Sequence, residues 1–183
     1  MSQTMGVAFE DDLPLAYVRM SASVLPAERL RLEQADIELL RSMTILDEGN
    51  AERSGDEVRD NELQRLEMKV NLLLDMMARL LSFQAELPSA RRVRMTAAGI
   101  EFGGATDLTV GDEVRVDVFL SAKLPRALVL LGRVASIDQE SQARIISLDG
   151  ASQAMQDAWD KFIFRQHRRM VAIQRRAVSS SSK

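Results

Sequence analysis

The feature that most constrains this chain is a heptad repeat between residues 62 and 87. Apolar side chains recur there at spacings of three and four residues, which is typical of a helix with a continuous apolar seam. At 1.5 Å per residue the repeat would form a rod of about 39 Å. Because a rod of this length would overhang a small domain and leave leucines in water, we expect the helix to associate with copies of itself.

The apolar face of this helix is wider than a two-stranded coiled coil needs, since the e and g positions are apolar as well as a and d. This width favours a bundle of more than two helices. An alternative is that a helix earlier in the chain covers part of the seam. The predicted oligomerisation residues are Leu63, Leu66, Val70, Leu73, Leu74, Met77, Leu80, Leu81 and Leu87.

The segment ahead of the repeat contains one recognisable element. Residues 1–24 show no sustained period and are left unassigned. After Pro26, residues 27–46 form a predicted amphipathic helix whose apolar face carries Leu32, Ala35, Leu39 and Met43. A charged linker with two glycines follows. We therefore divide this part into an N-terminal segment with helix and acidic linker (1–55) and a heptad-repeat oligomerisation helix (56–87).

Beyond Pro88, which ends the repeat, the apolar period changes from helical to alternating. Short strands are expected at 92–96, 99–102, 114–120, 128–137 and 143–148, separated by turns that contain glycine or proline. A final helix follows Gly150. This pattern favours an α+β fold with a small closed antiparallel barrel, spanning residues 88–176 with its helix and followed by a disordered tail at 177–183. The predicted core includes Val116, Val118, Leu130, Val134, Ile146, Trp159 and Phe162.

Composition removes most enzymatic and metal chemistry. The chain has no cysteine and a single histidine, His167, for which a solvated helix position is expected. No pair of acidic residues stands out as catalytic, so we expect no enzyme, no metal and no cofactor. No signal peptide or membrane-spanning stretch is present, which indicates a cytoplasmic protein.

Charge is distributed unevenly along the chain. Residues 1–62 hold 6 basic and 14 acidic residues, whereas residues 161–183 hold 7 basic residues and no acidic one. These basic residues lie mainly at the far end of the predicted C-terminal helix, where cations ordinarily complement the helix dipole. A nucleic-acid-binding function for this helix is the weaker interpretation, because the pI is near 5.3 and aromatic residues are few.

Several short motifs resemble the PilZ domain family. They are Arg91-Arg-Val-Arg-Met-Thr-Ala-Ala-Gly-Ile-Glu-Phe, Leu108-Thr-Val-Gly-Asp-Glu-Val-Arg-Val-Asp-Val, a Gly132-Arg-Val strand, and the closing Trp159-Asp-Lys-Phe-Ile-Phe-Arg-Gln-His-Arg-Arg helix. The resemblance implies a six-stranded barrel and a connection to the bacterial second messenger cyclic di-GMP. With a heptad helix ahead of the barrel, the chain is similar to atypical, tetrameric members that do not bind the nucleotide.

The family's two nucleotide-binding motifs are degenerate in this chain. The motif [D/N]-x-S-x-x-G falls on residues 94–99, where Gly99 is present, Thr96 replaces serine, and Arg94 replaces the acid or amide. A guanidinium has no hydrogen-bond acceptor for a guanine edge. The R-x-x-x-R motif has no match, because Arg91, Arg92 and Arg94 are too closely spaced. The resemblance therefore implies that cyclic di-GMP is not bound.

The expected function is a non-enzymatic oligomeric scaffold or adaptor in signalling related to cyclic di-GMP. It would act through protein contacts, as a homo-oligomer with an unidentified signalling protein as partner. The alternative is a cyclic di-GMP receptor that uses a divergent site formed by Arg91, Arg92 and Arg94. Neither hypothesis involves nucleic acid or membrane insertion.

Overall fold

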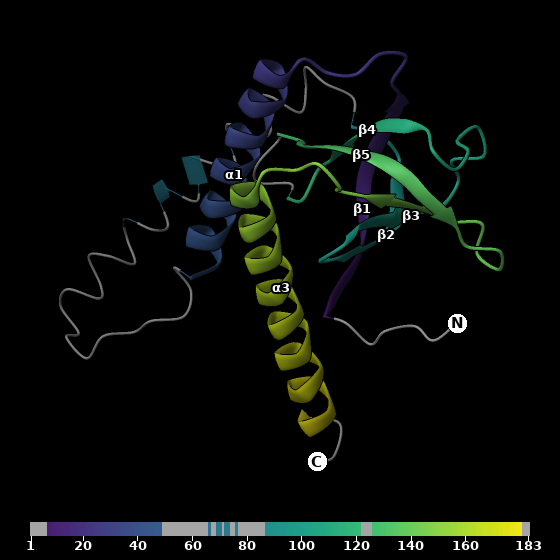
Figure 1. Cartoon of the computed structure of the whole chain (residues 1–183). Helices are drawn as coiled ribbons and strands as arrows, with labels where there is room; N and C mark the ends of the chain where they lie inside the picture. Colours follow the sequence, from purple (N-terminus) through teal and green to yellow (C-terminus); the bar gives the residue numbers. More distant parts are fainter. Residues whose placement is uncertain are drawn as a thin grey trace.

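Six strands form a closed barrel with two long helices packed on its outside (Figure 1). The structure is a computed structural model that describes residues 7–48, 66, 69, 70, 72, 73, 76, 87–121 and 126–180. The elements are β1 (Ala8–Arg19), α1 (Pro26–Glu48), β2 (Ala90–Thr96), β3 (Gly99–Phe102), β4 (Glu113–Val118), β5 (Leu128–Ile137), β6 (Arg144–Ser147) and α3 (Gln153–Ser180).

The strands follow the order β1-β2-β3-β6-β5-β4, and every neighbouring pair is antiparallel. Closure removes the exposed edges that would otherwise invite pairing with other chains. The expected barrel and C-terminal helix are confirmed. The predicted core positions are also confirmed, since each of those seven side chains is at most 4% exposed.

The N-terminal strand β1 corrects the expected domain boundary. Its first half pairs with β2 and its second half with β4, so it closes the barrel although the sequence analysis left residues 1–24 unassigned. Phe9, Leu13 and Leu15 point inward and are buried. Asp11 and Pro14 interrupt the alternation of apolar residues, and this interruption hides the strand in the sequence. A barrel domain that begins at residue 88 therefore lacks one of its six strands.

The helix α1 also differs from its predicted face. Leu39 is buried as expected, but Leu32, Ala35 and Met43 are only half-buried. The most enclosed polar positions of this helix are Glu33 and Asp36. By spacing, Asp36 lies on the predicted apolar face and Glu33 lies beside it. The spacing of apolar residues thus predicts the helix correctly, but it only partly predicts which face of the helix is buried.

The helix α3 covers the barrel with Met155, Trp159, Phe162 and Ile163, all at most 4% exposed. The helix continues to Ser180, so the tail expected from residue 177 is helical over its first four residues. His167 is half-buried rather than solvated, because its Nδ1 lies 2.9 Å from the carbonyl oxygen of Ala8 in β1. This contact ties α3 to the first strand.

Candidate functional site

The β2–β3 hairpin carries the residues predicted to be degenerate nucleotide-motif positions, and it places them on two different sides. In β2, Val93 and Met95 point into the barrel, so Arg92, Arg94 and Thr96 lie on its outer face. Arg91 lies two residues before Val93, so it is on the inward side of the strand. The structure therefore brings Arg92 and Arg94 together and separates Arg91 from them.

The outer arginines face carboxylates on both neighbouring strands. Arg94 lies opposite Glu10 in β1 and opposite Glu101 in β3. Its Nε is 3.4 Å from Glu10 Oε1, and its Nη1 is 3.3 Å from Glu101 Oε2. Arg92 lies opposite Asp12, and its Nη2 is 3.1 Å from Glu10 Oε2. Two guanidinium groups thus meet three carboxylates, and these arginines already have anionic partners.

The arginine Arg91 serves the end of the barrel instead. Its Nη1 donates to the carbonyl oxygen of Gly103 at 2.9 Å, and its guanidinium lies over the Tyr17 ring, 5.5 Å from the centroid. A Cβ at Gly104, which has a φ of +77°, would lie 2.6 Å from the same Nη1. These contacts fix the loop after β3 and engage Arg91 Nη1 and the face of the guanidinium, whereas Arg91 Nε is buried without a hydrogen-bond partner among the described residues.

Acidic residues of the following loop complete this closure of the barrel end. Tyr17 donates its hydroxyl to Asp107 Oδ1 at 2.5 Å, and this hydrogen bond raises the pKa of Tyr17 and lowers the pKa of Asp107. Asp112 accepts from the Thr109 backbone N–H at 2.7 Å, which is the main reason its pKa is lowered. Arg19 forms an ion pair with Asp112 at 2.9 Å. The acidic side chains at this end of the barrel, Asp107 and Asp112, are therefore paired with residues of the same chain.

Thr96 and Gly99 also have structural explanations. The carbonyl oxygen of Thr96 accepts a hydrogen bond from Trp159 Nε1 at 2.8 Å, which joins the hairpin to α3. A Cβ at Gly99 would overlap the carbonyl oxygen of Ile146, so the close approach of β6 requires glycine at this position. The glycine that anchors the motif in the sequence is thus needed for packing of the barrel.

The described residues of the heptad repeat are all exposed, and all of them except Leu87 are helical. Among the predicted oligomerisation residues, Leu66, Val70 and Leu73 are 59%, 49% and 60% exposed, and Leu87 is 45% exposed. Leu72 and Met76 are also exposed and helical. Leu63, Leu74, Met77, Leu80 and Leu81 lie outside the described residues. In a single chain the described members of this apolar seam are therefore left uncovered.

Sequence reasoning missed the acidic residues that pair with the arginines. Glu101 could have been found, because a tight two-residue turn places it opposite Arg94. Glu10 could not, because its strand was unassigned. Within the described ranges, no group of three metal-ligating side chains comes together, and no described helix is long and apolar enough to cross a membrane.

Comparison with known proteins points to one family. A family model described as an atypical PilZ domain, cyclic di-GMP receptor, matches residues 40–176. A solved structure of a pathogenic protein from Xanthomonas campestris, reported as a tetrameric PilZ domain self-assembled through a helical bundle, is similar with a TM-score of 0.73. The two chains are 22% identical over 93% of each, so this similarity shows the fold. No curated protein matches the chain.

Proposed function

The chain belongs to the atypical PilZ domain family, and from this membership we propose that it is a non-enzymatic oligomeric adaptor in bacterial signalling related to cyclic di-GMP. The adaptor assembles as a tetramer in the cytoplasm through its heptad helix. It acts on an unidentified signalling protein by direct contact. Its barrel serves as a rigid platform, and the protein performs no chemical step.

The exposed apolar seam carries the proposal. Leu66, Val70 and Leu73 each leave about half or more of their side-chain surface in solvent, although they share one face of a helix. Contiguous exposed apolar surface of this kind marks an interaction site. The similar Xanthomonas campestris protein is a tetramer assembled through a helical bundle. We assign the same mode of assembly to this chain, with the predicted oligomerisation residues as its core.

The arginine pairing supports protein contacts over nucleotide binding. An anionic ligand at Arg92 or Arg94 would have to displace Glu10 or Glu101 and would then face their carboxylates. Arg91 is committed to Gly103 and Tyr17. In this proposal Arg91 holds the loop after β3, Arg92 and Arg94 pair with carboxylates, and none of the three supplies a phosphate clamp.

The second candidate is a cyclic di-GMP receptor, which the description of the family favours. In that case the divergent site would use the outer face of β2, where Arg92 keeps 65% of its side chain exposed. The two candidates differ in what a cyclic di-GMP titration should show. The adaptor gives no saturable binding at low micromolar nucleotide, whereas the receptor gives it.

Light scattering on the purified full chain tests the proposed assembly. The wild type should have four times the 20.4 kDa mass of one chain. The double variant Leu66→Asp/Leu73→Asp should dissociate, because it would bury charges at two positions of the seam. The matched control is Leu30→Asp, at an exposed leucine of α1, which should remain tetrameric. A monomeric wild type, or equal masses for both variants, would contradict the proposal.

A further inference from the structure

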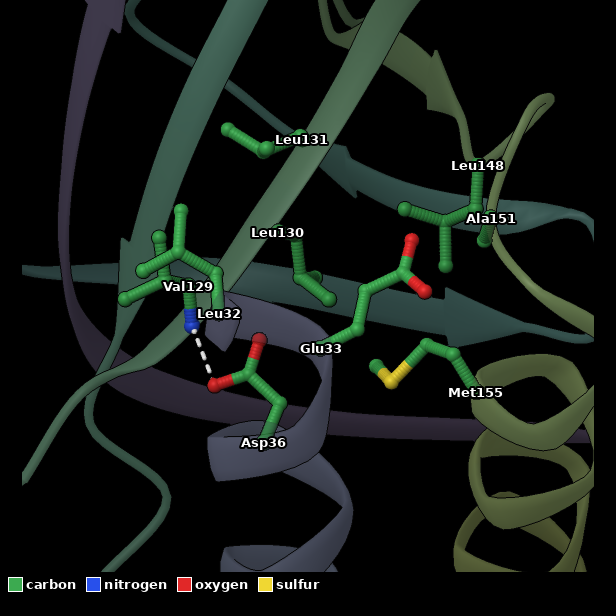
Figure 2. A pocket seen from close by; sticks show the side chains of 9 residues that line it. All are labelled: Leu32, Glu33, Asp36, Val129, Leu130, Leu131, Leu148, Ala151 and Met155. Carbon is green, nitrogen blue, oxygen red and sulfur yellow. Dashed lines mark hydrogen bonds between the residues drawn. The ribbon is translucent and has the colours of Figure 1, made fainter. Parts of the chain in front are cut away.

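The helix α1 is anchored by two buried carboxylates one turn apart. It packs against β5 and α3, with Glu33 and Asp36 facing the body of the protein (Figure 2). Glu33 is 8% exposed and Asp36 is 2% exposed. Neither forms an ion pair with any residue that the structure describes. Buried carboxylates without a salt-bridge partner are uncommon, so their backbone contacts determine what they do.

Each carboxylate accepts a backbone N–H from a different element. Asp36 Oδ1 is 3.1 Å from the nitrogen of Val129 in β5, as the dashed line in Figure 2 marks. Glu33 Oε2 is 3.2 Å from the nitrogen of Ser152, the residue that caps α3 by accepting from the Met155 N–H. In many helices a glutamate in the first turn accepts the backbone N–H of the N-cap residue of the same helix. Here the glutamate belongs to a different helix, because Glu33 of α1 accepts the N–H of Ser152, the N-cap of α3.

The two carboxylates differ in how well their charge is compensated. Glu33 lies at the N-terminus of α3, where the helix dipole favours an anion. Both carboxylates border a cavity of about 20 Å³, which has room for about one water molecule. The walls of this cavity are mainly apolar, with Leu130, Leu131 and Met155 among them.

Burial raises the pKa of Asp36 to about 7, against the opposing effect of the Val129 N–H. The charged groups around it are Glu33 on the same helix, Asp117 on β4 and the exposed Arg126 ahead of β5. The two acidic groups raise the pKa further, and Arg126 lowers it. Met155, the α3 residue that lines the cavity, is not titratable.

We propose that α1 seats on the barrel as a proton-dependent clasp, in which Asp36 takes up a proton when the helix docks and releases it when the helix leaves. The docked form binds more protons than the free form in the interval between the two pKa values of Asp36. The contribution of Asp36 to docking is therefore fully present below pH 3.8 and is lost as pH rises to about 7. The clasp is independent of the proposed assembly, because it involves α1, β5 and α3 of one chain.

Hydrogen exchange of the full chain measures the clasp directly. Protection of the α1 amides, corrected for intrinsic exchange, should fall about tenfold between pH 6 and pH 8. Asp36→Asn, which keeps the shape and an acceptor for Val129, should show no such fall. The matched control Glu38→Gln, at an exposed position of the same helix, should behave as the wild type.

A second measurement does not depend on any variant. Carbon NMR of the labelled wild-type carboxyl groups should show Asp36 titrating near pH 7 rather than near its ordinary value of 3.8. A midpoint near 3.8 would overturn the proposal. Protection of α1 that is unchanged from pH 6 to pH 8, or that falls equally in Asp36→Asn, would overturn it as well.

Discussion

Two elements from the N-terminal quarter of the chain, β1 and α1, both bring acidic side chains to the barrel. The acidic side chains Glu10 and Asp12 of β1 lie on the outer face and meet arginines. The acidic side chains Glu33 and Asp36 of α1 lie in the interior and meet backbone N–H groups. The residue types are the same, but the partners and the solvent access differ.

Because of this difference, the exposed carboxylates neutralise arginines, whereas a buried carboxylate can bind a proton. An exposed carboxylate beside an arginine stays charged and contributes little to stability, but it removes the arginine from use by an anionic ligand. A buried carboxylate beside a backbone N–H holds α1 in place and gains affinity for a proton. The acidic residues of β1 thus neutralise the outer arginines of β2, and in our proposal Asp36 makes the packing of α1 sensitive to pH.

Removing both elements should have the largest effect. A fragment of residues 88–176 lacks β1, so the edges of β2 and β4 that β1 joins would be unpaired and Leu15 would be missing from the core. We expect no cooperative thermal transition by circular dichroism. A synthetic peptide of residues 7–20, added in excess, should restore part of the transition.

A cooperative melt of this fragment without the peptide would contradict the role given to β1. It would also restore the domain boundary expected from the sequence.

Asp36 should give the next largest effect. Since its folded-state pKa is raised from 3.8 to about 7, the folded chain holds an extra proton between these values. The free energy of unfolding of the wild type should therefore fall by about 2–3 kcal/mol from pH 5 to pH 8. Urea unfolding of Asp36→Asn should lack this fall.

The opposite slope is expected in acid, which provides an internal control. The pKa values of Asp107, Asp112 and Asp138 are lowered by hydrogen bonds in the folded chain. Their contribution is lost as pH falls through those lowered values, in the wild type and in Asp36→Asn alike. A variant that still loses stability between pH 5 and pH 8 would assign the effect to another group.

Glu33 should have a smaller effect than Asp36. Glu33→Gln keeps an oxygen for the Ser152 N–H but removes the charge at the N-terminus of α3. We expect a loss of about 1 kcal/mol in the free energy of unfolding at pH 7. The exposed substitution Glu38→Gln is the control and should be neutral. Equal losses for the two variants would show that the charge of Glu33 is unimportant.

The exposed acidic residues of β1, Glu10 and Asp12, should have the smallest effect on stability. Glu10 is 43% exposed, and ion pairs at such positions contribute little. Glu10→Gln should change the free energy of unfolding by less than about 0.5 kcal/mol, measured by urea unfolding at physiological salt. A loss of 2 kcal/mol or more in the free energy of unfolding would mean that Glu10 stabilises the barrel as well as neutralising arginines.

The sequence predicts the elements of this molecule better than it predicts the environments of their polar side chains. The alternating strands after Pro88 and the helix with Trp159 follow directly from apolar periodicity. The strand β1 does not, because Asp11 and Pro14 break its pattern while its partners lie about 80 or more residues away in the chain. Asp36 lies on the apolar face by spacing, four residues after Leu32, but burial of a carboxylate is not expected unless its hydrogen-bond partner is known.

The candidate site shows the same limit. That Gly99, Thr96 and the three arginines are degenerate motif positions stays a prediction, and it treats adjacent residues of one strand as one cluster. Alternation along β2 places Arg91 on the opposite side from Arg92. The carboxylates that pair with Arg92 and Arg94 depend on the strand register, which local patterns do not determine.

Titration calorimetry with cyclic di-GMP tests the central claim most directly. The wild-type full chain at physiological salt should show no saturable binding at low micromolar nucleotide, with GTP as the comparison of similar charge. We expect the same for Arg92→Ala/Arg94→Ala, because the arginines are already held by Glu10 and Glu101. Saturable binding that GTP does not reproduce, and that this double variant abolishes, would contradict the account and establish the outer face of β2 as a nucleotide site.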